Sequence, residues 1–339
     1  MATSIVIRQC EENDLADLLD IAQHIGFGLT HLLPNATALA EKIELAQRSF
    51  AKKIDALNNE LYLFVMEDTA SKKVIGCSGI ITQVGDVQPY YNYKIIHHIQ
   101  SSDELGIAHK NSVLQLSNDY QGLSELGMLA LQEQYHGLHL GTFLSRVRFL
   151  YLVDNPQRVT AKIIAQMRGI IDNTGECVFW QGVGQKFIDL PFLEVDQRIA
   201  QGHGHFVAEL LPDTPIAVAL LPDLVQAVIG KTHPETVPDL VLLTKEGFTF
   251  ENYINIFEGG PCLELYLKES ATVRNAHRVR IAAIVPQLSG PAYMIATLEK
   301  KFRACLGEVV FQDEESITLT THTAQLLNVN IGDTVRISL

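Results

Sequence analysis

The segment Lys231-Thr232-His233-Pro234 contains the residue type best suited to moving protons near neutral pH. An imidazole titrates close to neutrality and can both donate and accept a proton. Pro234 favours an extended backbone at His233. Taken alone, the pattern is more typical of a loop histidine near a helix C-terminus, where the helix dipole stabilises positive charge. Proton transfer by His233 is therefore a hypothesis that needs further support.

A second candidate is a strand, loop and helix between Glu125 and Leu150. Acyl-CoA enzymes of the GNAT type bind the pyrophosphate of CoA at backbone N–H groups where such a helix begins. Their usual loop pattern is Gln/Arg-x-x-Gly-x-Gly/Ala, of which this chain keeps the final glycine. An ordinary strand-to-helix turn would look similar. The residues expected to contact CoA in this loop are His136, His139, Gly141 and Thr142.

Motifs for other chemistries are missing. Three close histidine pairs, His97-His98, His136/His139 and His203/His205, have no third ligand at a recognisable spacing. HExxH is also absent, so we expect no metal site. The chain contains neither GxxxxGK[ST] nor GxSxG, which argues against a P-loop enzyme and a hydrolase nucleophile elbow.

Composition narrows the classes of partner and the compartment. The net charge of −13 comes without a basic stripe, so a nucleic-acid partner is not expected. The most apolar run, from Ile216 to Leu221, is too short to cross a membrane, and no secretory signal is visible. Five scattered cysteines without CxxC spacing indicate reduced thiols and a cytoplasmic protein.

Hydrophobic periodicity predicts alternating strands and helices along most of the chain. The N-terminal half should contain strands at Ile5 to Arg8, Tyr62 to Met66, Val74 to Val84 and Glu125 to Leu131, with helices at Asp14 to Ile25, Thr37 to Leu57 and Gly141 to Val153. Thr37 is the expected N-cap of the second helix. The following half should contain strands at Thr160 to Met167, Phe248 to Phe250 and Tyr253 to Phe257, and helices at Pro222 to Ile229 and Val237 to Glu246.

The pattern of predicted elements changes after about residue 270. Short strands are expected there at Arg278 to Ile284, Glu308 to Phe311, Ser316 to Thr321 and Thr334 to Leu339. The turn at Asp154-Asn155-Pro156 suggests a boundary. We therefore expect an α/β fold with mixed sheets, built from two halves at residues 1–153 and 154–268, followed by a small β-rich region at 269–339.

Several segments in order resemble the arginine/ornithine succinyltransferase family, from about residue 5 to residue 265 and more weakly beyond. They are Gly28-Leu29-Thr30, Leu33-Pro34, Phe64 to Asp68, Tyr91-Asn92-Tyr93, Ser124-Glu125-Leu126, Met167-Arg168-Gly169, Phe179-Trp180, Ala208 to Pro212, Ile229 to Pro234, Glu246-Gly247-Phe248 and Tyr253 to Pro261. Each match is weak, but their order over this length is specific.

The resemblance implies a tandem GNAT-like fold and transfer of succinyl from succinyl-CoA to the α-amino group of arginine. Succinyl-CoA would be a co-substrate, with no permanently bound cofactor. His233 matches the family's proton-donor histidine, and Leu129 its succinyl-CoA contact. Backbone N–H groups near Met128 and Leu129 would stabilise the oxyanion. The resemblance also implies a homo-oligomer or a hetero-oligomer with a related subunit.

The chain departs from the family pattern at the CoA loop, where His136 and His139 replace an arginine and a glycine. Two alternatives therefore stay open. The chain could be a non-catalytic or regulatory subunit of the acyltransferase type. It could also be an N-acyltransferase with a different acyl donor, or with a different acceptor such as ornithine.

Overall fold

The computed structural model describes residues 4–24, 32–53, 56–86, 88–200, 204–298 and 301–339. The strands are β1 Ile5–Gln9, β2 Leu61–Asp68, β3 Lys73–Ile81, β4 Asn92–Ser102, β5 Ile107–Ser117, β6 Ser124–Leu131, β7 Lys162–Gln166, β8 Ile216–Ala217, β9 Thr249–Asn255, β10 Pro261–Tyr266, β11 His277–Val285, β12 Ala292–Thr297, β13 Arg303–Glu308, β14 Val310–Phe311, β15 Ser316–Thr320 and β16 Thr334–Ser338. The helices are α1 Leu15–His24, α2 Ala36–Ala51, α3 Leu140–Asp154, α4 Val178–Gly182, α5 Phe192–Ala200, α6 His205–Leu210, α7 Asp223–Val228, α8 Val237–Glu246, α9 Ala271–Arg274 and α10 Thr321–Leu327.

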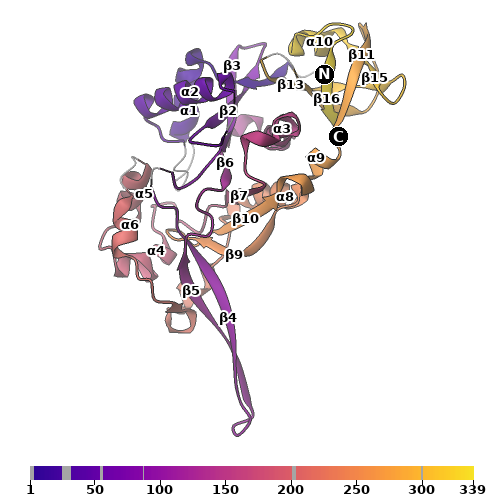
Figure 1. Ribbon diagram of the computed structural model, residues 1–339. Coiled ribbons are helices and arrows are strands. Elements are labelled where there is room, and N and C mark those ends of the chain that lie inside the picture. Colours follow the sequence, from indigo (N-terminus) through magenta and orange to yellow (C-terminus); the bar gives the residue numbers. More distant parts are fainter. Residues whose placement is uncertain (1–3, 25–31, 54–55, 87, 201–203, 299–300) are drawn as a thin grey trace.

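All of these strands join edge to edge in one mixed sheet, in the order β14-β15-β11-β16-β12-β13-β1-β2-β3-β6-β7-β10-β9-β4-β5-β8. The pairs β6/β7 and β11/β15 are parallel and the other pairs are antiparallel. The expected α/β fold with a β-rich C-terminal region is confirmed, and Figure 1 shows that region at one end of the molecule.

Strand β2 explains how the centre of the sheet is covered. Its alternate residues Tyr62 and Phe64 pack with α3 on one face, and Leu63 and Val65 pack with α1 and α2 on the other. Because side chains alternate between the two faces of a strand, a strand covered on both sides is apolar at successive positions. The helices on both faces hold the centre of the sheet in place, including β3 and β6, which form one wall of the candidate site.

One predicted helix differs at both ends. α2 begins after Asn35, whose side chain accepts a hydrogen bond from the Ala38 N–H at 3.1 Å, so Asn35 and not Thr37 is the N-cap. The helix ends at Ala51 instead of Leu57, because Lys52 has an extended backbone. The matched segment Gly28-Leu29-Thr30 and His203 lie outside the described residues.

The prediction of two strands at Phe248 to Phe250 and Tyr253 to Phe257 is wrong. A single strand, β9, runs from Thr249 to Asn255 and spans most of both segments, and Asn252 has a left-handed φ of 65° within it. The register with β10 shifts at this point, so the polar Glu251-Asn252 pair forms a bulge and not a turn. Strand β10, which was not predicted from the sequence, starts at Pro261, directly after Gly259-Gly260.

The ribbon formed by β4 and β5 was not predicted from the sequence, and neither were the strands β12 and β13 near the C-terminus. Figure 1 shows the ribbon reaching away from the rest of the chain. Its paired residues run from Asn92 with Ser117 to Ser102 with Ile107. Polar and charged residues dominate its sequence, which hid its strand character.

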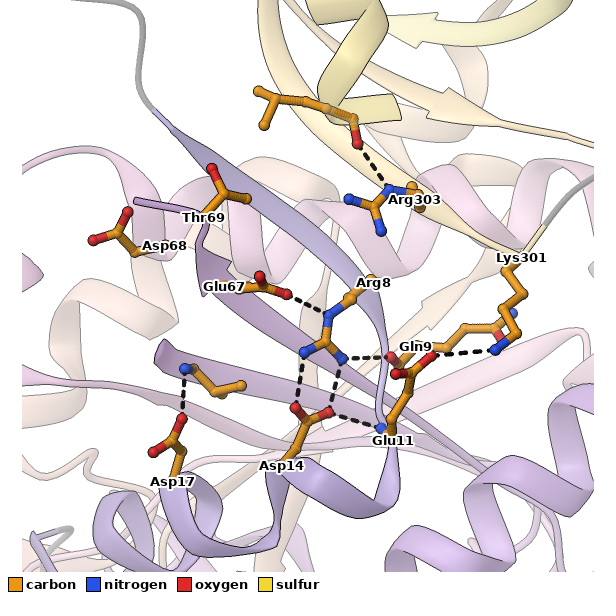
Figure 2. Close-up of polar contacts among 12 residues, drawn as sticks. Arg8, Gln9, Glu11, Asp14, Asp17, Glu67, Asp68, Thr69, Lys301 and Arg303 are labelled. Atoms are coloured by element: carbon orange, nitrogen blue, oxygen red, sulfur yellow. Dashed lines mark hydrogen bonds and ion pairs between the residues drawn. The ribbon is translucent and has the colours of Figure 1, made fainter. Parts of the chain in front are cut away.

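Strand β1 joins the C-terminal strands to the rest of the sheet, with β13 on one side and β2 on the other. Arg8 anchors it, as Figure 2 shows. The Arg8 guanidinium donates to both carboxylate oxygens of Asp14 at 2.8 Å and to Glu67 at 2.6 Å. Asp14 also accepts from the Glu11 N–H at 2.7 Å. This fork ties β1, β2 and the start of α1 together.

Candidate functional site

A cavity of 570 Å³ lies where β6 and β7 separate. The two parallel strands are paired at Ser124 with Ile163 and at Glu125 with Ile164, near their starts. Residues 125–130 then line one side of the cavity and residues 165–168 line the other. Strand edges that part in this way expose backbone N–H and C=O groups, which can pair with an amide-containing ligand.

A β-bulge at Met128 lies on the cavity wall. Met128 has a left-handed φ of 56°, and the register of β6 with β3 shifts between Cys77 and Gly79. The Cys77 thiol donates to the Met128 carbonyl at 3.3 Å. A bulge takes one residue out of the ladder, which frees backbone groups for a ligand. Met128 and the next residue, Leu129, both line the cavity.

The predicted CoA loop lies at the far end of β6, outside the cavity lining. His136 and His139 are exposed, and His139 caps α3 with a left-handed φ of 60° but no side-chain hydrogen bond. Gly141 and Thr142 occupy the first turn of α3. The first N–H groups of a helix have no partner within the helix, so this turn is a possible anion site. The structure therefore separates the loop from Met128 and Leu129 by the end of β6.

His233 is buried, and backbone groups contact both of its ring nitrogens. Nε2–H donates to the Ile171 carbonyl at 3.1 Å, and Nδ1 accepts from the Glu235 N–H at 3.3 Å. The His233 N–H donates to the Arg168 carbonyl at 2.8 Å. Arg168 lines the cavity, whereas His233 is not part of its lining. The ring therefore lies one residue behind the cavity wall, with the Glu235 carboxylate 3.7 Å from Nδ1.

A chain of polar side chains, buried at Glu125 and half-buried at the other three residues, crosses the cavity wall from β6 to β9. The Tyr90 hydroxyl donates to Glu125 at 3.4 Å and is itself contacted by the Gln166 amide. The Asn255 amide donates to Gln166 at 2.6 Å. Burial raises the pKa of Tyr90 well above its ordinary value, so its hydroxyl keeps the proton that it donates. These bonds hold the β6, β7 and β9 walls in register.

Glu258 is a cavity residue that the sequence analysis did not select. Its side chain is 5% exposed and lines the cavity together with Asp196 of α5. Burial and the Asp196 charge raise its pKa to about 8, although the Gly169 N–H and the Arg168 charge act in the opposite direction. The relevant signal in the sequence was its position beside Gly259-Gly260, where glycine at a left-handed φ of 67° permits a tight turn.

Comparisons with known proteins agree along almost the whole chain. Family models described as arginine N-succinyltransferase beta subunit and as its C-terminal domain match residues 5–272 and 277–338. The chain belongs to the arginine N-succinyltransferase beta subunit family. It is 38% identical to arginine N-succinyltransferase of Yersinia enterocolitica and 37% identical to that of Salmonella typhi, covering 98% of this chain and 96% of each relative.

The solved structure of arginine/ornithine succinyltransferase subunit AI from Pseudomonas aeruginosa has a TM-score of 0.88 to this family member. The two are 30% identical, and the match covers 98% of each chain. Within the part of this chain that the structure describes, no cluster of three or more His, Cys, Asp or Glu side chains is arranged to hold a metal ion. None of the described helices is long and apolar enough to span a membrane.

Proposed function

We propose that this chain transfers succinyl from succinyl-CoA to the α-amino group of arginine. The observation that supports this most directly is the bulge at Met128 and Leu129, on the wall of a cavity between two separating parallel strands. The amine nitrogen attacks the thioester carbonyl carbon, forming the C–N bond, and the C–S bond then breaks. CoA leaves as a thiolate that takes up the proton lost by the amine, which yields succinylated arginine and free CoA.

In this proposal, the backbone N–H groups at Met128 and Leu129 stabilise the oxyanion of the tetrahedral intermediate. The pantetheine arm lies along the open edge of β6, and the CoA pyrophosphate contacts His136, His139 and the first turn of α3 at Gly141 and Thr142. Thr142→Asp would place a negative charge in that turn while still suiting a helix start. Calorimetry should show CoA binding weakened at least tenfold, with Thr321→Asp on α10 as the matched control.

We propose that His233 carries the proton from the amine of the acceptor to the thiolate of CoA. One ring hydrogen bond must open for this, and the Nδ1 contact with the Glu235 N–H is the longer of the two. A proton taken up on Nδ1 then faces the Glu235 carboxylate at 3.7 Å, which stabilises the charged ring. His233→Ala should lower turnover by at least 100-fold. The exposed His277→Ala is the control, and turnover unchanged in His233→Ala would exclude the assignment.

The decisive assay is thiol release from succinyl-CoA by the purified chain, with arginine and then ornithine as acceptor. Release that depends on arginine supports the proposal. Release with ornithine alone would replace arginine as the acceptor, and no release with either would favour a non-catalytic subunit. The five cysteines are all free and buried, which fits a reducing compartment, and we propose a cytoplasmic location.

We also propose that the chain forms an oligomer through the β4–β5 ribbon, with a second copy or a related subunit. A ribbon of two strands is marginally stable by itself, and its outer part exposes Ile99 at 79% and Leu105 at 69%. Replacing both by Ser should lower the sedimentation coefficient, whereas Leu220→Ser, at another exposed leucine, should not. A monomeric wild-type chain in sedimentation velocity would refute this.

A further inference from the structure

The β9–β10 turn holds a buried carboxyl group against the cavity in a fixed position. The Asn255 side chain accepts from the N–H groups of Phe257 and Glu258 at 2.7 and 3.2 Å. A β-carbon on Gly169 would lie 2.2 Å from the Glu258 carbonyl oxygen, and Gly259 has a left-handed φ of 67°. The turn therefore has almost no freedom, and the Glu258 side chain is placed by the fold.

Among the described residues, Glu258 has no charge partner of its own on this wall. Its Oε2 atom is buried and has no hydrogen-bond partner among the described residues. Arg168, the cation that faces it, is paired with Glu235 at 3.0 Å. Asp196 adds a second carboxyl group and no compensating charge. A buried carboxyl group beside another carboxyl group is costly unless a cation arrives, and the arrangement suits a cationic ligand that enters the cavity.

Resting on the proposed function, we propose that Glu258, with Asp196 beside it, binds the cationic end of the acceptor amino acid's side chain. A guanidinium group carries five N–H donors in a plane and can engage two carboxyl groups at once. The α-amino group at the other end of the same molecule then extends along the cavity toward the bulge at Met128. Glu258 thus acts in substrate specificity and not in the chemical step.

The test compares arginine with citrulline, which has nearly the same shape but carries no charge, and with ornithine, at saturating succinyl-CoA. Glu258→Gln should raise KM for arginine by about 10- to 100-fold, the effect of losing a charge-assisted hydrogen bond. KM for citrulline and for succinyl-CoA should change little. The control Glu251→Gln alters an exposed carboxylate of β9 that is not in the lining of this cavity.

An unchanged ratio of arginine to citrulline kcat/KM in Glu258→Gln would overturn the inference, even if the wild-type chain is active. Calorimetry with arginine and CoA separates this from failure of the proposed function, because it reports binding without turnover. Arginine binding that Glu258→Gln weakens, in a chain without thiol release, would support the subsite and not the reaction. Equal arginine binding by both proteins, or none by the wild type, would refute it. A larger loss with ornithine would assign the subsite to an ammonium group.

Discussion

Replacing Glu258 by Gln should stabilise the protein, and should do so more at high pH than at low pH. The ordinary pKa of a glutamate is 4.5, and burial with the Asp196 charge raises that of Glu258 to about 8 in the folded chain. Below pH 4.5 the carboxyl group is protonated in both states. As pH rises toward 8 the unfolded chain ionises it while the folded chain does not, so stability is lost over this window.

The difference between these two pKa values, at about 1.36 kcal/mol per pKa unit, corresponds to about 5 kcal/mol. This is a ceiling, because local relaxation that admits water lowers it. Glutamine has the same shape and cannot ionise. We therefore expect Glu258→Gln to resemble the wild type at pH 4.5 and to be more stable by about 2 to 5 kcal/mol at pH 9.

Urea unfolding followed by circular dichroism at several pH values from 4.5 to 9 measures this difference. Asp196, Arg168, Cys177 and Cys262 are the charged or titratable groups that interact with Glu258. They are present in both proteins, so subtracting the two pH profiles isolates Glu258. The control Glu251→Gln should run parallel to the wild type. A constant difference between wild type and Glu258→Gln across the pH range would refute the reasoning, since it would mean that Glu258 ionises normally in the fold.

Gly169→Ala should destabilise the protein by about 3 kcal/mol in urea unfolding, since its β-carbon would overlap the Glu258 carbonyl oxygen. Met128→Val should lose about 1 to 2 kcal/mol, because a β-branched residue resists the left-handed backbone of the bulge, whereas Met128→Leu, which keeps the apolar volume without a branched β-carbon, should lose less. Arg8→Met should lose about 3 kcal/mol, because it leaves the Asp14 carboxylate largely buried without its partner.

Each of these variants has an outcome that contradicts its argument. Gly169→Ala with wild-type stability would mean that the β9–β10 turn has room to relax. A Met128→Val variant as stable as Met128→Leu would remove the argument for strain at the bulge. Lys73→Met breaks a pair with Asp17 in which the lysine is exposed, and it should lose less than about 1 kcal/mol. A loss as small for Arg8→Met would show that the hydrogen bonds from Arg8 to Asp14 and Glu67 contribute little to stability.

The elements that local signals define were predictable from the sequence. α8 runs from Val237 to Glu246 and is closed by Gly247 with a left-handed φ of 115°, as the C-terminal glycine indicated. α3 covers the predicted helix, and its apolar residues are buried against the sheet. Caps and periodicity involve residues within a few positions of each other, so a sequence window contains the information.

The site depended on contacts between distant parts of the chain. The separation of β6 from β7 makes the cavity, and it follows from the two pairs at the starts of these strands, which no local pattern records. The ring of His233 is held by Ile171, 62 positions earlier, so its distance from the cavity could not be read locally. From the sequence alone, Glu258 would be expected in a turn exposed to solvent. Only its burial beside Asp196 makes it a candidate for binding a cation. The sequence by itself determined the family, the local elements and the candidate histidine, whereas tertiary packing decided which polar groups lost water and faced the cavity, because desolvation depends on neighbours brought together by folding.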